Sequence, residues 1–118
     1  MTTLEDFLKL NKDKKIWTAT KDQNVRQALI LMSENNIGAI IVVDNDDSPI
    51  GIFSERDYAR KVILKGKSSK DTLLDEVMTK ELITATKDYK IDQCMKTMNE
   101  KRIRHLPVLE KKKIVGII

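Results

Sequence analysis

The stretch Gly51-Ile52-Phe53-Ser54-Glu55-Arg56-Asp57 predicts a strand that leads directly into a helix. The apolar run that ends at Phe53 is typical of a strand, and Ser54 is a favoured residue at the position before a helix. A helix that begins there presents unpaired backbone N–H groups and the positive end of its dipole, which together attract an anion. Asp57 would repel a phosphate but can accept hydrogen bonds from two sugar hydroxyls. One short turn is therefore a candidate site for both a ribose and a phosphate.

The same residues also fit a capping box, in which Ser54 bonds forward to the backbone of Asp57 and Asp57 bonds back. Caps are common and nucleotide sites are rare, so these residues by themselves favour a cap alone. The rest of the chain shifts the balance towards a ligand site in which capping is a simultaneous role.

The composition is that of a globular protein. The chain has 118 residues, of which 41% are hydrophobic and 34% charged, enough for one compact domain. No apolar run approaches the roughly 20 residues that span a bilayer, and the N-terminus does not resemble a signal peptide. One cysteine, Cys94, excludes an internal disulfide, and one histidine disfavours a zinc site. We expect a cytoplasmic protein without a metal or a catalytic cofactor.

A repeat runs along the chain. The five residues Thr18-Ala19-Thr20-Lys21-Asp22 recur in the same order as Thr84-Ala85-Thr86-Lys87-Asp88, at an offset of 66. An apolar helical stripe follows each copy, then a buried strand, a polar turn and a second strand. The matching segments are Val25 to Met32 with Ile91 to Met98, Asn36 to Asp44 with Arg102 to Glu110, and Ile50-Gly51-Ile52 with Val115-Gly116-Ile117.

Four segments are predicted. They are an N-terminal helix and connector (residues 1–15), a first repeat (16–66), a connector with a lead-in helix (67–79) and a second repeat (80–118). Each repeat is too small to bury both faces of its sheet, so the two should pack together. Leu4, Phe7 and Leu8 share one face of the first helix, which packs on the main body or on another chain. The second repeat is expected to be truncated, because its Ser and Asp equivalents would fall just after Ile118.

These residues resemble a tandem pair of CBS domains, named for cystathionine β-synthase and also called a Bateman module. The resemblance runs from about Ile16 to Ile118 and rests on the repeat, the Gly51 to Asp57 signature and the Arg104-His105-Leu106-Pro107-Val108 segment. Ser-Glu-Arg-Asp-Tyr-Ala-Arg-Lys-Val from Ser54, then Ser-Ser-Lys and Glu-Val-Met-Thr, are similar to small stand-alone bacterial proteins of this kind. The resemblance implies an α+β (α/β) fold of two pseudo-twofold-related repeats, each a small sheet with helices, packed sheet to sheet about two clefts.

The resemblance also implies a ligand, an adenine nucleotide (AMP, ADP, ATP or NAD(H)), bound by a non-catalytic regulatory module. Asp57 would hold the ribose, Ser54 and the helix N-terminus the phosphate, and the second repeat the base and further phosphates. The implied site comprises Ile52, Phe53, Ser54, Arg56, Asp57, Ile83, Thr84, Arg104 and His105. A second cleft would use Ile16, Trp17, Thr18, Gly38 and Ala39, although Trp17 can equally be a packing residue. That cleft lacks its Asp and is expected to be weak or empty.

Other interpretations remain open. Arg104 and His105 can be a solvated strand end, and Cys94 is expected to be a small core residue. The chain can also be a ligand-independent homodimeric scaffold for a partner enzyme or transporter, which the N-terminal helix favours; the effector is unknown. Nucleic-acid binding is disfavoured because the net charge of +4 is dispersed, and an enzyme because no nucleophile–base pair is visible.

Overall fold

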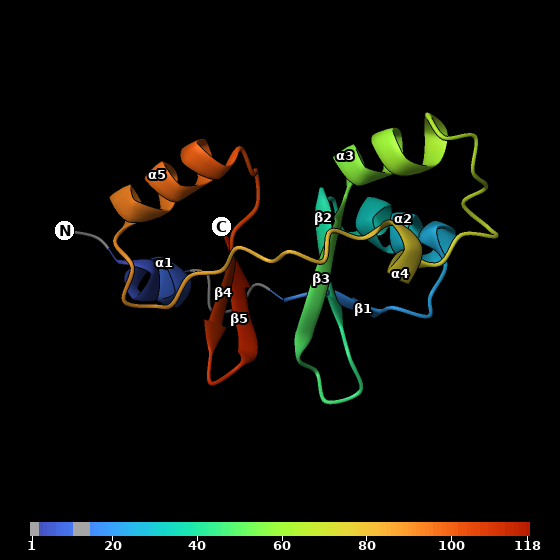
Figure 1. Ribbon diagram of the computed structural model, residues 1–118. Coiled ribbons are helices and arrows are strands. Elements are labelled where there is room, and N and C mark those ends of the chain that lie inside the picture. The colour runs from blue at the N-terminus through green and yellow to red at the C-terminus, as the bar shows by residue number, and fades with distance from the viewer. Residues whose placement is uncertain (1–2, 11–14) are drawn as a thin grey trace. The chain divides into compact units, whose positions relative to one another are not determined.

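The computed structural model describes residues 3–10 and 15–118, so part of the predicted first connector lies outside the described residues. The chain forms two compact units. The central unit is Trp17–Leu82, and the split unit joins the N-terminal residues up to Ile16 with Ile83–Ile118. In Figure 1 the central unit runs from light blue to yellow, and the split unit combines the dark blue and the orange-to-red segments.

The central unit is a three-stranded sheet with helices. Its strands lie in the order β1-β2-β3, with β1 parallel and β3 antiparallel to β2. The elements are β1 (Thr18–Thr20), α2 (Val25–Glu34), β2 (Ala39–Val43), β3 (Pro49–Ser54), α3 (Glu55–Asp57), the π-helix η1 (Tyr58–Ile63) and α4 (Leu74–Val77). The predicted apolar stripe of α2 packs on the sheet with residues of β2, β3, η1 and α4, and every residue of β2 is buried.

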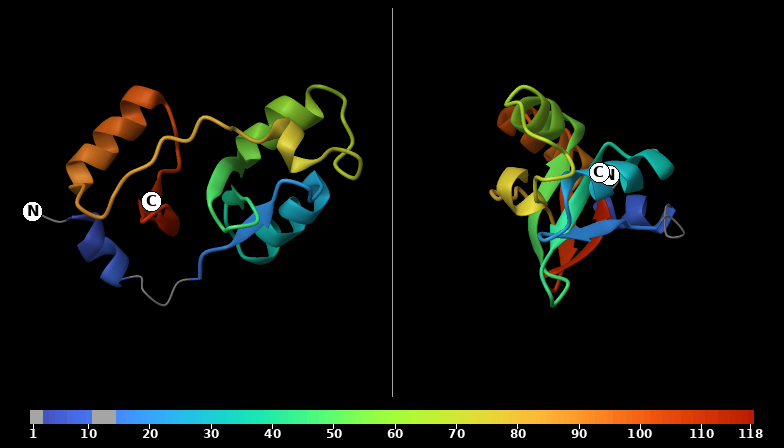
Figure 2. Two further views of the ribbon diagram at one scale, coloured as in Figure 1. Left: turned by 60° about the horizontal axis from the view of Figure 1, so that its bottom comes forward. Right: turned by 90° about the vertical axis from the view of Figure 1, so that its right-hand side faces the viewer.

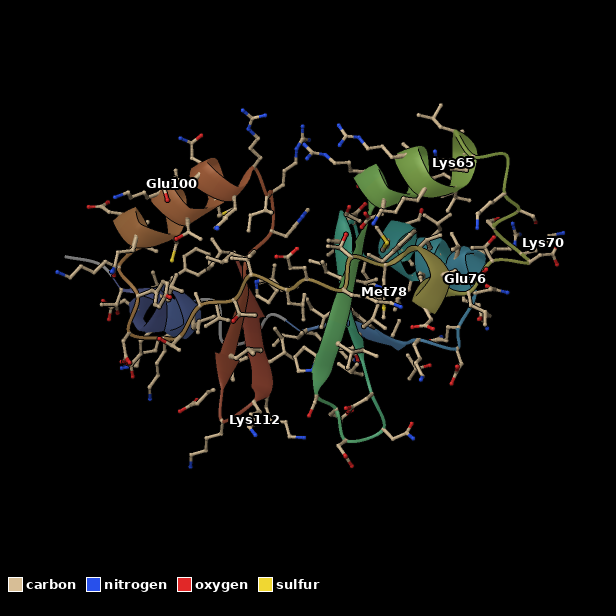
Figure 3. All side chains as sticks on the ribbon, in the orientation of Figure 1. Lys65, Lys70, Glu76, Met78, Glu100 and Lys112 are labelled. Atoms are coloured by element: carbon tan, nitrogen blue, oxygen red, sulfur yellow. The ribbon has the colours of Figure 1, made fainter. Side chains whose placement is uncertain are left out.

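The split unit is built from segments that are far apart in the sequence. Its elements are α1 (Leu4–Leu10), α5 (Ile91–Lys101), β4 (Pro107–Glu110) and β5 (Lys113–Ile117). The hairpin of β4 and β5 is antiparallel, and Lys112 lies in its turn (Figure 3). Leu4, Ala85, Cys94, Leu106 and Val108 form its buried core.

The two units repeat each other in strand register. Ala19 pairs in parallel with Val42, and the residues 66 positions later, Ala85 and Val108, form the same parallel bridge. Val42 pairs with Gly51 as Val108 pairs with Gly116, and the register shifts directly after Val42 and Val108 alike. The predicted repeat and the α+β fold class are therefore confirmed.

The helices α1 and α4 are also equivalent, which the sequence reasoning missed. In the central unit the N–H of Leu74 donates to the carbonyl of Gln23 (2.9 Å), and in the split unit the N–H of Leu4 donates to Tyr89 (2.8 Å). Gln23 and Tyr89 are again 66 residues apart. Figure 2 shows α1, in blue, beside the red β4–β5 hairpin. The side chain of Leu8 on α1 packs against Gly116 of β5.

The helix after Ser54 differs from its prediction. The sequence predicted a helix that begins after Ser54; the structure has the short α-helix α3 there, which widens into the π-helix η1 and ends at Ile63. The N–H of Leu64 donates to the carbonyl of Ala59, five residues earlier. The wider turn keeps both Tyr58 and Val62 against the core of the central unit.

Candidate functional site

The turn from β3 to α3 carries the central part of the predicted site. Ser54 ends the strand with extended dihedral angles (φ −123°, ψ 167°) and caps the helix. Its Oγ accepts the N–H of Asp57 at 3.2 Å, and Oδ2 of Asp57 accepts the N–H of Ser54 at 3.0 Å. The capping box is thus present, and it holds the Asp57 carboxylate beside the backbone of Ser54, where β3 ends and α3 begins.

The Asp57 carboxylate has four hydrogen-bond or ionic partners. Besides the N–H of Ser54, its Oδ2 accepts the Ser54 hydroxyl at 3.1 Å. Its Oδ1 accepts the Thr79 hydroxyl at 3.1 Å and lies 3.0 Å from Nζ of Lys61. Asp57 is 8% exposed, and it is the one buried charged residue in residues 3–10 and 15–118. A buried charge needs such partners, because removal from water disfavours an unpaired carboxylate.

Sequence reasoning missed Lys61 and Thr79. Lys61 lies four residues after Asp57, so the helical spacing of an acid and a base was an available signal. Its Nζ also donates to the Thr79 hydroxyl at 3.2 Å. Thr79 carried no signal, because it reaches the site only where the chain returns to the edge of β3 and exchanges two backbone hydrogen bonds with Ile52 (3.0 and 2.8 Å).

Two of the backbone donors at the start of α3 already have partners within the central unit. The N–H of Glu55 donates to the carbonyl of Gly38 at 3.1 Å, and the N–H of Asp57 is held by Ser54. Gly38 and Ala39, predicted for a second cleft, therefore lie beside this turn, and Ala39 pairs directly with Ser54 in the sheet. A phosphate at this turn would depend on side chains more than on free amides.

The remaining predicted residues of the central unit differ in exposure. Phe53 is fully buried in the core, so only its backbone is available to a ligand. Ile52 and Arg56 are half-buried. Trp17 packs against the core, as one of its two interpretations held, and Thr18 is exposed in β1.

The split unit holds the other predicted residues. Arg104 and His105 do not lie in a strand, because β4 begins only at Pro107. Arg102 adopts a left-handed conformation (φ 55°) that ends α5 and turns the chain, and the ladder starts afterwards. Arg104 is exposed and His105 half-buried. Ile16, Ile83 and Thr84 are half-buried, and Ile83 packs against the core of this unit.

The remaining ionisable groups give no second candidate. Burial raises the pKa of the Cys94 thiol, and Cys94 is a buried core residue of the split unit. The hydrogen bond to Glu110 raises the pKa of Lys87. Within the described ranges no group of three His, Cys, Asp or Glu side chains could hold a metal ion. None of the described helices has the length and apolar character to cross a membrane.

Comparison with known families gives a match over most of the chain. A family model described as CBS domain matches residues 3–64 and 74–118. The chain is 39% identical to the mitochondrial CBS domain-containing protein CBSX3 of Arabidopsis thaliana, over 99% of this chain and 60% of that protein. It is 35% identical to the uncharacterized protein MK0525 of Methanopyrus kandleri, over 74% of this chain and 45% of that protein. The chain thus spans less than two thirds of these two relatives.

Solved structures match over nearly the full chain. A putative signal-transduction protein with CBS domains from Burkholderia ambifaria is 45% identical, with a TM-score of 0.93 over 99% of this chain and 87% of that chain. The CBS domain pair of protein MJ0100 is 27% identical, with a TM-score of 0.87 over 100% of this chain and 89% of that chain. That structure is a complex with 5′-methylthioadenosine and S-adenosyl-L-methionine.

Proposed function

The chain belongs to the CBS domain family and carries the domain as a tandem pair, a regulatory module, and we propose that it binds an adenine nucleotide without catalysing a reaction. The ligand class is AMP, ADP, ATP or NAD(H). In this proposal Asp57 holds the ribose and Ser54 contributes at the phosphate. In the same proposal the second repeat also contacts the ligand, with Ile83 and Thr84 at the base and Arg104 and His105 at the phosphates.

The observation that carries the proposal is the buried carboxylate of Asp57 at the β3–α3 turn. An ionised carboxylate accepts hydrogen bonds and donates none. The two neighbouring hydroxyls of a ribose can both donate to it. The MJ0100 structure supports the adenine and ribose part of this ligand class, because both molecules in that complex contain an adenosyl group. Binding would regulate only if the ligand prefers one arrangement of the protein over another.

The test is calorimetric titration and thermal shift with AMP, ATP and NADH, with GTP as the control nucleotide. A ligand at 100 times its Kd should stabilise the fold by about 2.7 kcal/mol. Asp57→Asn should abolish the stabilisation, and circular dichroism of that variant must show the native fold, since Asp57 also caps α3. The matched control is Asp47→Asn, because Asp47 is exposed in the β2–β3 turn and its left-handed conformation (φ 61°) suits Asn. Absence of binding by all three adenine ligands would refute the proposal.

A second candidate function is a protein-interaction module, which the exposed apolar side chains favour. Leu64 at the end of η1 and Met95 on α5 are 76% and 63% exposed. Two of the three apolar residues of the N-terminal helix that favoured this alternative are not available to a partner. Leu4 is fully buried in the split unit, and Leu8 packs against Gly116. A CBS-CP12 protein from bloom-forming cyanobacteria, 27% identical, is hexameric.

Sedimentation over a concentration series would test this alternative. Leu64→Glu should shift the chain towards the monomer if copies of the chain associate through Leu64, because a charge at the contact is desolvated. Lys65→Glu is the control, since Lys65 is exposed at the neighbouring position (Figure 3). A wild type that stays monomeric at every concentration would exclude a homo-oligomer.

A further inference from the structure

The two oxygens of the Asp57 carboxylate are occupied by different kinds of donor. Both donors on Oδ2 belong to Ser54, one from its backbone and one from its hydroxyl. The backbone bond belongs to the cap of α3, and Ser54 Oγ is held in place because it also accepts the N–H of Asp57. Both donors on Oδ1 are side-chain groups from elsewhere, the ammonium of Lys61 and the hydroxyl of Thr79.

The carboxylate is therefore filled before any ligand arrives. Two carboxylate oxygens offer about four lone-pair positions, and four donors lie against them. A ribose that hydrogen-bonds to Asp57 must displace at least one of these donors. The Oδ1 donors come from residues outside the cap, so they can yield while both bonds of the capping box stay in place.

Lys61 and Thr79 differ in how easily they move. The Lys61 side chain is 41% exposed, so its ammonium can turn into water and keep its hydration. The backbone of Thr79 is fixed by its two hydrogen bonds to Ile52, so only its hydroxyl can rotate away. When Lys61 leaves Oδ1 it also leaves the Thr79 hydroxyl, which it donates to at 3.2 Å. The departure of Lys61 therefore vacates one position on Oδ1 and leaves the Thr79 hydroxyl without the donor that orients it.

Building on the proposed function, we propose that Lys61 and Thr79 are internal competitors of the ligand, which occupy Oδ1 of Asp57 in the free protein and are displaced by the sugar hydroxyls. They set the affinity for the ligand without belonging to the ribose contact themselves. Lys61 then stabilises the ligand-free fold and weakens ligand binding by the same contact.

The experiment measures the affinity for adenosine by calorimetry in the wild type, Lys61→Met, Thr79→Val and the control Lys65→Met. Adenosine is uncharged, so attraction between Lys61 and a phosphate does not enter. Lys61→Met should bind adenosine about fivefold more tightly, the scale of a partly exposed ion pair. Thr79→Val should gain about threefold, the lower end of what one side-chain hydrogen bond contributes net. Lys65→Met should equal the wild type, since Lys65 is exposed and lies four residues further along the chain.

Two further readouts separate competition from a general effect on the fold. The melting temperature of ligand-free Lys61→Met should fall below that of the wild type although its affinity rises. The gain in affinity should shrink for 2′-deoxyadenosine, which brings one hydroxyl fewer to Asp57. Binding by Lys61→Met where the wild type does not bind would also support the inference.

Three results would overturn it. If the wild type binds adenosine and Lys61→Met binds equally or more weakly, the competition is refuted while the proposed function stands. If Lys61→Met weakens AMP binding and leaves adenosine binding unchanged, Lys61 is a phosphate ligand instead. If neither the wild type nor any variant binds adenosine, AMP, ATP or NADH, the proposed function itself fails, and the inference fails with it.

Discussion

The central unit and the split unit each carry one short helix at the same place, α4 in the first and α1 in the second. Each helix is closed by an acidic side chain on its first turn: Glu76 accepts the N–H of Leu73 at 2.7 Å, and Asp6 accepts the N–H of Thr3 at 3.2 Å. The first residue of each helix, Leu74 of α4 and Leu4 of α1, is fully buried in its unit. The two helices are therefore structural counterparts.

The units differ in the contacts that these helices and their flanking residues make with the neighbouring strand. In the central unit Met78 (labelled in Figure 3) and Thr79 lie against Gly51 of β3, and the Thr79 hydroxyl donates to Asp57. In the split unit the side chain of Leu8 lies against Gly116 of β5. In both units an apolar side chain from this region packs on a strand glycine. Among the described residues, the bridge that joins such a flanking residue to a strand is Ile52–Thr79 of the central unit, and the Thr79 hydroxyl adds a polar link to the candidate site. The two units therefore share the apolar packing of the short helix, and the polar contacts of Asp57 are added to it in the central unit.

The largest expected effect tests whether α1 is as integral as α4. Leu74→Ala and Leu4→Ala each remove a fully buried side chain, so each should lower the free energy of unfolding by about 3 kcal/mol. Urea unfolding of both variants measures this. A loss below about 1 kcal/mol for Leu4→Ala beside a full loss for Leu74→Ala would show that α1 is only an appendage.

The next effect tests the difference at the two glycines. A Cβ at Gly51 would lie 2.7 Å from Sδ of Met78 and 3.1 Å from the carbonyl oxygen of Thr79, a backbone atom held by its bridge. A Cβ at Gly116 would meet the end of the Leu8 side chain, which can rotate. Gly51→Ala should therefore cost about 2 kcal/mol and Gly116→Ala about 1 kcal/mol or less, by thermal unfolding. Equal costs would mean that the two edges are equally rigid.

A smaller effect concerns the caps of the two helices. Glu76→Ala should destabilise the fold by about 1 kcal/mol, because the N–H of Leu73 loses a short hydrogen bond. Asp6→Ala should cost about half as much, since its bond is longer. Chemical denaturation with the conservative variants Glu76→Gln and Asp6→Asn as controls would check this. A reversed order would contradict the assignment of the stronger cap to α4.

The smallest effect concerns the helices that carry the repeated stripe. Burial raises the pKa of Cys94, so the folded state retains the thiol proton above the ordinary value of 9.0 at which the unfolded chain begins to lose it. Stability should therefore fall as pH rises from about 9 towards the folded pKa. Cys94→Ala, which copies Ala28 of the central unit, should reduce this slope in denaturation at several pH values. An unchanged slope would assign it to other groups.

The sequence predicted the apolar frame well and the polar contacts in part. The repeated Thr-Ala-Thr-Lys-Asp segment and the stripe of α2 recur in the structure, because strand and helix periodicity are local properties. The capping box of Ser54 and Asp57 was also readable, because both partners lie within four residues. Arg104 and His105 were placed in a strand because their apolar neighbours suggested one, whereas the left-handed Arg102 delays it.

What the sequence by itself determined is the family, the fold class and the turn that carries Asp57, since these depend on repeats and short-range patterns. The tertiary structure alone decided that α4 packs back onto the central unit, that α1 packs in the split unit, and that Thr79 joins Lys61 on the Asp57 carboxylate. Thr79 is 22 residues from Asp57, and no periodicity links the two. A contact of that range depends on where burial and strand pairing bring the chain back, and this is a property of the whole fold.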